Sequence, residues 1–290
     1  MTSSRRVQIR RRRAAAALVV VVVLALIAAA ASGSHHTSPR ARATSTGPKQ
    51  RAKAPASPPL PENAQDATVA SVLKYTPFVK EGSERAREIA LTFDDGPGPY
   101  TPGVLEVLER LHVHATFFEI GEMLRYFSAS TLRELRDGDV VGDHTETHPE
   151  MARLSAHQQR EELFEQLARI ELLGGQRPTL FRPPYGSYDA TTMRELRKLH
   201  LLMVLWSVDT DDYLQPGVSA IVQRALAGAH PGAIILMHDA GGTRTQTIEA
   251  LPTIIRRLRA RGYRLVTVPQ LLRDDPPPPG QTLPSSLDGD

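Results

Sequence analysis

The chain has 290 residues, enough for one domain with a substantial core, and it contains no cysteine. Disulfides are therefore excluded, and any metal site has to be built from histidine and carboxylate ligands. The net charge of +3 conceals an asymmetry: residues 1–81 carry 13 basic and 3 acidic residues, whereas residues 82–290 carry 22 and 29. The acidic part lacks the basic surface that nucleic-acid binding requires, so we expect no nucleic-acid partner.

Residues 1–31 have the pattern of a signal anchor or a signal peptide. Six arginines fall within residues 5–13 and precede 18 residues, 14–31, that carry no polar side chain. A positive segment before an apolar run of membrane length is typical of an N-terminal anchor. A cleaved signal peptide is the alternative, with "AAASGS" as the region of cleavage. Both interpretations place the rest of the chain outside the cytoplasm, either anchored to the membrane or secreted.

Two segments have compositions typical of disorder. Residues 32–82 are rich in Pro, Ala, Ser, Thr and basic residues and have few side chains to bury, which predicts a disordered linker. Residues 273–290, with four consecutive prolines, predict a disordered tail by the same argument. The folded domain is therefore expected over residues 83–272.

Within residues 83–272, short apolar runs alternate with amphipathic helical stretches, which predicts an α/β fold with a parallel sheet. The apolar runs are almost continuous, as expected of strands covered by helices on both faces. The expected strands are 88–93, 115–120, 139–144, 179–182, 201–206, 233–238 and 263–268. The expected helices are 101–113, 130–138, 155–175, 189–200, 219–229 and 245–262. The chain contains no Gly-x-Gly-x-x-Gly motif and no phosphate-binding loop, so nucleotide binding has no support.

Polar side chains follow five of these strands. In chain order they are Asp94 and Asp95, His144 and His148, Arg182, Asp209 and Asp212, and His238. The carboxyl ends of the strands of a β/α barrel meet on one face, where active sites are built. This placement favours a barrel over an open sheet and predicts that these side chains converge.

The stretch "GDHTETH" carries two histidines four residues apart, His144 and His148. On one helical turn that spacing lets two imidazoles share a metal ion. Adding one carboxylate from the pair Asp94–Asp95 gives two histidines and one aspartate, the ligand count of a catalytic zinc site with an open position for water. The second aspartate then lies near a metal-activated water and can serve as its general base.

Each motif alone has a simpler interpretation. Asp94 and Asp95 precede Gly and Pro and on their own indicate a turn. Arg182 on its own indicates a surface ion pair, and the acidic stretch "WSVDTDDY" a solvated loop. His238 alone is more often a structural hydrogen-bond partner, but an acidic loop beside it can raise its pKa and make it a general acid. Adjacent aspartates are too close in sequence for the paired carboxylates of a glycoside hydrolase.

Taken in order, five motifs resemble the polysaccharide deacetylase family, which is carbohydrate esterase family 4 with its NodB-homology domain. They are "TFDDGP" (92–97), "HTETH" (144–148), "RPPYG" (182–186), "DTDDY" (209–213) and "LMH" (236–238). The resemblance covers about residues 83–270 and implies a distorted (β/α)7 barrel. One departure is Tyr213, which stands where the family's fourth motif usually ends in Trp. An aromatic wall of the acetyl pocket is still expected, and its shape and hydrogen bonding are left open.

The resemblance also implies a role for each motif residue. It makes Asp94 the general base and Arg182 the residue that holds Asp94 in place. The metal ligands are Asp95, His144 and His148. The backbone N–H of Tyr185 helps to stabilise the oxyanion, and His238, positioned by Asp209, protonates the leaving amine.

The function that follows is metal-dependent removal of N-acetyl groups from a polysaccharide that contains N-acetylglucosamine, such as peptidoglycan or a chitin-like oligomer. The alternatives are an O-acetyl esterase on a xylan-like polysaccharide and a non-catalytic glycan-binding barrel. The expected metal is zinc, with cobalt or another divalent ion as the alternative. The expected partners are the acetylated polysaccharide and, through the N-terminal segment, the membrane. The sequence indicates no particular oligomeric state.

Overall fold

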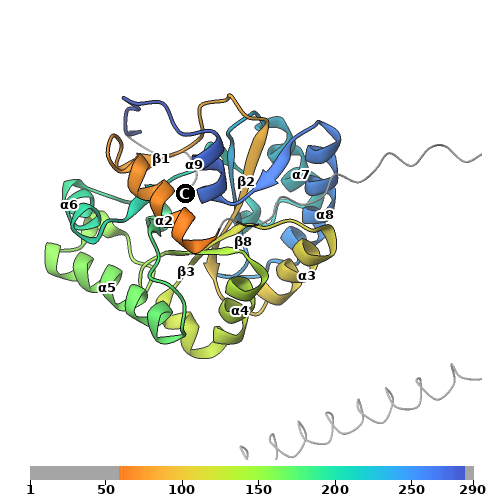
Figure 1. The fold of residues 1–290 in the computed structure, drawn as a ribbon. Coiled ribbons are helices and arrows are strands. Elements are labelled where there is room, and N and C mark those ends of the chain that lie inside the picture. Colours follow the sequence, from red (N-terminus) through yellow and green to blue (C-terminus); the bar gives the residue numbers. More distant parts are fainter. Residues whose placement is uncertain (1–58, 60, 285–290) are drawn as a thin grey trace, which may run out of the picture. The chain divides into compact units, whose positions relative to one another are not determined.

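The computed structural model describes residue 59 and residues 61–284 (Figure 1). The predicted anchor or signal segment, 1–31, lies outside these residues. No helix in the described part of the chain is long and apolar enough to span a membrane.

In the described part of the chain, nine strands form one sheet in which every ladder between named strands is parallel. Their order is β1-β6-β5-β4-β3-β2-β8-β7, and β9 pairs with the first part of β2. The strands are β1 (Phe78–Val79), β2 (Glu88–Gly96), β3 (Thr116–Glu119), β4 (Val140–Asp143), β5 (Leu180–Phe181), β6 (Leu202–Val204), β7 (Val208–Asp209), β8 (Ile234–His238) and β9 (Arg264–Val266). The predicted strands between residues 88 and 268 are all present, which confirms the α/β fold with a parallel sheet.

The sheet is curled, because one stretch of chain supplies strands near both ends of the strand order. Strand β6 pairs with β1 and β5, whereas β7, four residues later, pairs with β8. Between them, the N–H of Leu205 donates to Val79 and the N–H of Ser207 donates to Ile234. The two ends of the sheet are therefore brought towards each other, which makes the sheet a curled half-barrel, where the resemblance implied a distorted (β/α)7 barrel.

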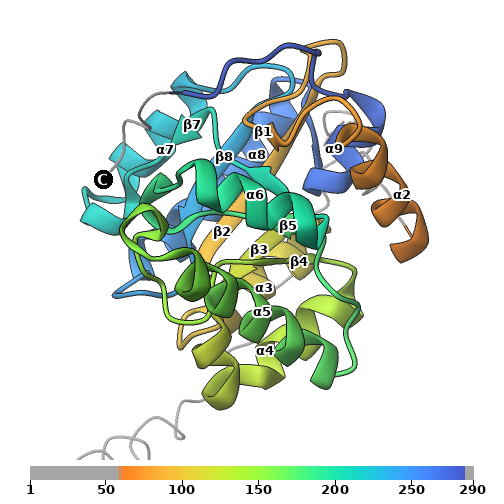
Figure 2. The same ribbon diagram turned by 90° about the vertical axis from the view of Figure 1, so that its left-hand side faces the viewer.

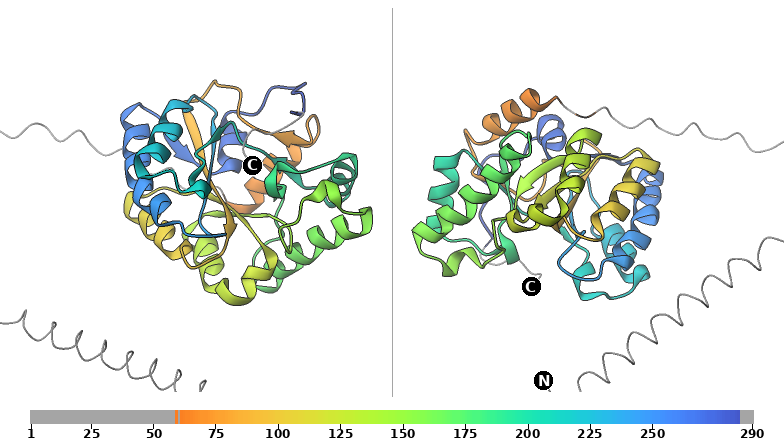
Figure 3. Two further views of the ribbon diagram at one scale, coloured as in Figure 1. Left: turned by 180° about the vertical axis from the view of Figure 1, so that it is seen from behind. Right: turned by 90° about the horizontal axis from the view of Figure 1, so that it is seen from below.

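Helices surround the curled sheet (Figures 1, 2 and 3). Helices α3, α7 and α8 pack on β2 and β8 through one apolar cluster, and α5 and α6 contribute to a second cluster beside β5 and β6. Their bounds are α2 (Glu62–Val72), α3 (Thr101–Leu111), α4 (Leu124–Asp137), α5 (Ala156–Leu172), α6 (Ala190–Leu199), α7 (Val218–Ala227), α8 (Thr245–Ala260) and α9 (Val268–Asp274). Capping boxes begin two of them, at Ser155 for α5 and at Asp189 for α6.

Strand β2 separates the outer core from the interior of the curled sheet. Side chains of a strand alternate between its two faces. Ile89, Leu91 and Phe93 belong to the cluster under α3 and α8. Ala90 belongs to the interior cluster. Thr92, two residues later on the same face of the strand, accepts a hydrogen bond from the buried Arg182. The alternation continues to Asp94, which therefore faces inward at the carboxyl end of the strand.

The prediction of a disordered linker over residues 32–82 is wrong for its last part. Helix α2 and strand β1 lie within it, and the side chains of Val69, Val72, Phe78 and Val79 are all buried. Val69 and Val72 join an interior cluster with residues of α9, so these few apolar side chains are enough to order the segment once α9 covers them.

The prediction of a disordered tail over residues 273–290 is also wrong for the part that the structure describes. Helix α9 runs to Asp274, and Asp275 is buried, accepting hydrogen bonds from Ser83 and the backbone of Arg85. Further on, the hydroxyl of Tyr188 donates to the carbonyl of Pro284. Tertiary contacts thus order a segment whose composition alone would not.

Candidate active site

Asp94 and Asp95 both face the site because the strand is irregular between them. Regular alternation would send two neighbouring side chains to opposite faces of the sheet. The register of β2 against β3 shifts between Asp94 and Gly96, and Asp95 adopts a positive φ of 72°. This bulge turns the Asp95 carboxylate towards the side of the sheet on which Asp94 lies. Two adjacent carboxylates are thereby placed in one pocket.

The register of the neighbouring strands brings the other predicted residues to the same edge. Asp94 lies level with His238 in the pairing of β2 with β8. Asp143 lies level with Phe181 in the pairing of β4 with β5, so the residues that follow them, His144 and Arg182, also lie side by side. This is the carboxyl edge of a parallel sheet, where the sequence placed the site.

Among residues 59 and 61–284, the only cluster of three or more histidine or acidic side chains that could hold a metal ion is Asp95, His144 and His148, called the metal group below. One ligand atom from each residue can be chosen so that all three lie within 4.8 Å of one another. The Nε2 atoms of His148 and His144 lie 3.1 Å and 3.7 Å from Oδ1 of Asp95. That oxygen is buried and accepts no hydrogen bond of good geometry within the described part of the chain, although Nε2 of His148 is within 3.1 Å of it. Two imidazole nitrogens gathered beside one carboxylate oxygen fit a ligand set that shares a cation.

The protonation of these groups also suits a metal. Nδ1 of His144 donates to the backbone carbonyl of Arg182 at 2.8 Å, which leaves Nε2 free to bind. Burial lowers the pKa of His144 to about 4, so the imidazole is neutral at pH 7. Burial opposes ionisation of Asp95, but the contact with His148 and the positive charge of His238 hold its pKa below the usual range.

Arg182 fixes the orientation of Asp94. Its guanidinium is fully buried and donates to Oδ1 of Asp94 and to the hydroxyl of Thr92, each at 2.8 Å. It also donates to the carbonyls of Val204 and Leu205, which leaves it little freedom to move. The other carboxylate oxygen, Oδ2 of Asp94, lies 3.9 Å from Nε2 of His144. Arg182 therefore holds Asp94 through Oδ1 alone, and Oδ2 faces the metal group.

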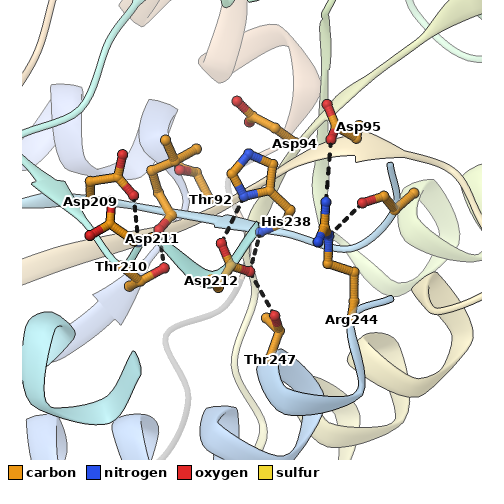
Figure 4. A network of polar contacts seen from close by, with 12 residues as sticks. Thr92, Asp94, Asp95, Asp209, Thr210, Asp211, Asp212, His238, Arg244 and Thr247 are labelled. Atoms are coloured by element: carbon orange, nitrogen blue, oxygen red, sulfur yellow. Dashed lines mark hydrogen bonds and ion pairs between the residues drawn. The ribbon is translucent and has the colours of Figure 1, made fainter. Parts of the chain in front are cut away.

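His238 is oriented by Asp212, whereas the resemblance assigned this role to Asp209 (Figure 4). Nδ1 of His238 lies 2.7 Å from Oδ1 of Asp212, whose other oxygen accepts from the His238 backbone and from Thr247. Asp209 instead accepts from the backbone of Asp211. Strand β7 ends at Asp209, and the chain has to turn before a carboxylate can reach His238, so the acid three residues later makes the contact.

The surroundings of His238 and of Asp209 both raise the pKa of the side chain, for different reasons. Burial opposes a positive charge on His238, but the Asp212 carboxylate outweighs it and raises the pKa of His238 to about 9. Burial raises the pKa of Asp209 to about 6. His238 is therefore a cationic acid at neutral pH, with its Nε2 turned away from Asp212.

Tyr185 lies at the rim of the site with about half of its surface exposed. It has a positive φ of 57°, an uncommon conformation that points to a functional constraint on the turn. Its hydroxyl lies 3.1 Å from Nδ1 of His148, on the side of the imidazole opposite Asp95. The phenol therefore contacts His148, a contact that no feature of the sequence predicts.

A pocket of about 430 Å³ contains this site. Its walls include the predicted residues Asp94, Asp95, His144, His148, Tyr185 and His238, together with Ile120, Pro183, Trp206, Tyr213, Leu236, Gly241 and Arg244. The ring of Tyr213 lies edge-on to His238, with 5.4 Å between ring centroids. Tyr213 thus occupies the pocket wall, and Trp206 supplies a second aromatic surface there.

One pocket residue, Arg244, was missed by the sequence analysis. It is nearly buried, its Nε donates to the carbonyl of Ala240, and one of its terminal nitrogens lies 3.9 Å from Oδ2 of Asp95 (Figure 4). It stands six residues beyond the last motif, in a loop rich in glycine, and nothing in its surroundings in the sequence distinguishes it from a surface arginine. The spatial approach of this loop to Asp95 is what reveals it.

Comparison with known proteins gives a consistent result. A family model described as polysaccharide deacetylase matches residues 81–204. A peptidoglycan-N-acetylglucosamine deacetylase of Bacillus cereus is 34% identical over 204 residues, which are 70% of this chain and 74% of the relative. A peptidoglycan-N-acetylmuramic acid deacetylase of Bacillus subtilis is 40% identical over 63% of this chain but only 38% of its own length.

A solved structure agrees in fold. The crystal structure of a peptidoglycan N-acetylglucosamine deacetylase with a hydroxamate-type benzamide bound superposes with a TM-score of 0.67 at 32% identity. The match covers 73% of this chain and the whole of that one. At this identity, the likeness extends beyond the general arrangement of strands and helices.

Proposed function

Since the chain belongs to the polysaccharide deacetylase family, we propose that it is a metal-dependent hydrolase that removes N-acetyl groups from a polysaccharide containing N-acetylglucosamine. The observation that carries the proposal is the position of Asp94, which is held by Arg182 beside the group Asp95, His144 and His148. Peptidoglycan and chitin-like oligomers are the substrates in question.

Asp95, His144 and His148 would hold the metal. The buried oxygen of Asp95 close to both imidazoles and the neutral form of His144 fit a divalent cation. Zinc suits the donor set best, and cobalt or another divalent ion is the alternative. Such an ion would act as a Lewis acid on the acetyl carbonyl and would lower the pKa of water.

Asp94 acts as the general base in this proposal. It takes a proton from the water whose oxygen bonds to the acetyl carbon, and Arg182 keeps one carboxylate oxygen occupied so that the other faces the water. The contact also places the buried guanidinium 2.8 Å from Oδ1 of Asp94.

Two groups complete the reaction. As the carbonyl oxygen becomes negative, the backbone N–H of Tyr185 donates to it, a contribution of about 3–4 kcal/mol for a well-placed donor. The C–N bond then breaks, and cationic His238 gives its proton to the departing amine. Asp212 keeps Nδ1 of His238 occupied, so that the proton leaves from Nε2. The products are acetate and the free amine of the sugar.

The choice of N-acetyl over O-acetyl substrates is supported by two observations. The relatives of known function described above are N-acetyl deacetylases by name. A raised pKa at His238 suits an amine, a poorer leaving group than an alcohol, because the amine must be protonated to depart. An O-acetyl esterase and a non-catalytic glycan-binding barrel are the competing functions.

The proposal also places the domain outside the cytoplasm, where these polymers lie. The six arginines before the apolar run 14–31 support this location. Fractionation of cells that express the full chain tests it, because a purely cytosolic protein would contradict both the anchor and the signal peptide.

Acetate release from a panel of acetylated glycans tests the activity. Peptidoglycan, chitin oligomers and acetylated xylan are compared, each with and without a chelator. We expect release from the first two and none after chelation. Release from xylan alone would indicate the esterase, and binding without release from any glycan would indicate the non-catalytic barrel.

A further inference from the structure

The loop that carries both histidines, residues 144–148, has an unusual backbone. Thr145 and His148 adopt positive φ values of 69° and 62°, which are uncommon for residues other than glycine. The loop follows β4 and is no part of a helix or strand. Its shape therefore depends on contacts made by the residues between and beside the two histidines.

Glu146, the residue midway between the histidines, points away from the metal group and towards helix α5. Its carboxylate is 5% exposed, and both of its oxygens lie 2.8 Å from Nε of Arg169 on α5. A terminal nitrogen of the same arginine lies 2.6 Å from one of them. The carboxylate also packs against Gly121, where a Cβ would collide with it. This ion pair is the main side-chain contact of the middle of the loop.

A second contact from α5 holds the next residue. Both the backbone N–H and the hydroxyl of Thr147 donate to Glu162, at 2.8 Å and 2.7 Å. On the inner side, the loop is bonded through its backbone to residues 121 and 122. Helix α5 thus contacts the two residues that directly precede His148, with one cation and one anion.

We propose that helix α5 sets the metal affinity of the site, with Arg169 and Glu162 acting as positioning residues for His144 and His148. The inference rests on the proposed metal site. Neither residue touches the ligand atoms, but groups that orient metal ligands typically change metal affinity about 10–100-fold when they are removed. The strained backbone at Thr145 and His148 makes the loop prone to relax once its outer contacts are lost.

Helix α5 itself offers a matched control. Arg160, on the same helix, also pairs with a nearly buried glutamate, Glu195, at 3.1 Å. That pair makes no contact with the loop of residues 144–148. Arg160→Met therefore reports the general effect of removing an ion-paired arginine from α5, with Glu195 still held by Lys198 at 2.7 Å.

The experiment measures zinc affinity of the full chain by competition with a chromophoric chelator. We expect Arg169→Met to weaken zinc binding about 10–100-fold, Arg169→Lys to restore part of the loss, and Arg160→Met to change it less than about twofold. The variant Arg169→Met with Glu146→Gln should lose no more than Arg169→Met alone, because the two residues act as one unit. The visible spectrum of the cobalt-loaded protein should change in Arg169→Met and stay unchanged in Arg160→Met.

The other outcomes separate the inference from the proposed function. If the unaltered protein binds zinc and Arg169→Met binds it equally well, α5 does not set the affinity, while the metal site stands. If both arginine variants weaken binding to the same extent, the effect is general destabilisation and the inference fails. If the unaltered protein binds no divalent metal, the proposed function fails and takes the inference with it.

Discussion

The site has two halves, the pair His238–Asp212 and the group Asp95, His144 and His148, and they differ in how their polar atoms are satisfied. On one side, His238 is the last residue of β8, and Asp212 meets it with every contact satisfied: Asp212 accepts from the imidazole, the backbone of His238 and Thr247. On the other side, Asp95 and His148 lie in positive-φ backbone, and Oδ1 of Asp95 lies 3.1 Å from Nε2 of His148 without a hydrogen bond of good geometry among the residues described. The proton-donating half is complete as it stands, whereas the half with Asp95 has the residues of a candidate metal site.

Removal of metal should therefore have the largest effect. Dialysis against a strong chelator is expected to abolish acetate release, and added zinc should restore it, because three ligands lose their common partner. Metal content is measured on the same samples. Undiminished activity in a sample verified to be free of metal would contradict a role for Asp95, His144 and His148 as metal ligands in the reaction.

A change in the complete half should act through pH and leave metal content unaltered. In Asp212→Asn, the carboxylate that raises the pKa of His238 is lost, so His238 deprotonates at lower pH. A general acid works only below its pKa. The alkaline limb of the rate profile should move to lower pH, and turnover at pH 8 should fall about 100-fold.

Asp209→Asn is the control for this variant, because Asp209 does not contact His238 in the structure. Its alkaline limb should stay near that of the unaltered protein. A shift in Asp209→Asn that equals or exceeds the shift in Asp212→Asn would show that Asp209 orients His238 after all.

A smaller effect is expected from the phenol that borders the incomplete half. Tyr185→Phe removes the hydroxyl beside Nδ1 of His148, which orients that ring. Zinc affinity should fall about tenfold. Tyr188→Phe, three residues later, loses a hydroxyl bonded only to Pro284 in the structure and should keep full affinity. Equal affinities in both variants would mean that His148 needs no support from Tyr185.

The same contrast explains which features were predictable from sequence. The strands from residue 88 onwards are marked by apolar runs, and parallel strands end at one edge, so Asp94, Asp95, His144 and His238 were expected to meet. The choice between Asp209 and Asp212 was beyond the sequence, because it depends on how the chain turns after β7. Helix α2 was missed because its few apolar residues are ordered by α9, from the far end of the domain. Contacts between distant segments, such as Arg169 with Glu146, leave no local pattern.

The neighbours Asp94 and Asp95 have opposite roles in the proposed reaction, one in proton transfer and one in metal binding. The most direct test measures zinc per protein and turnover in Asp94→Asn and Asp95→Asn. Asp94→Asn should keep its zinc and lose about 10²–10⁴-fold in rate, without rescue by added zinc. Asp95→Asn should lose zinc and regain part of its activity at high zinc concentration. If Asp94→Asn loses its zinc while Asp95→Asn retains it, the assignment is inverted, and if neither variant slows more than a few-fold, the two aspartates only shape a turn.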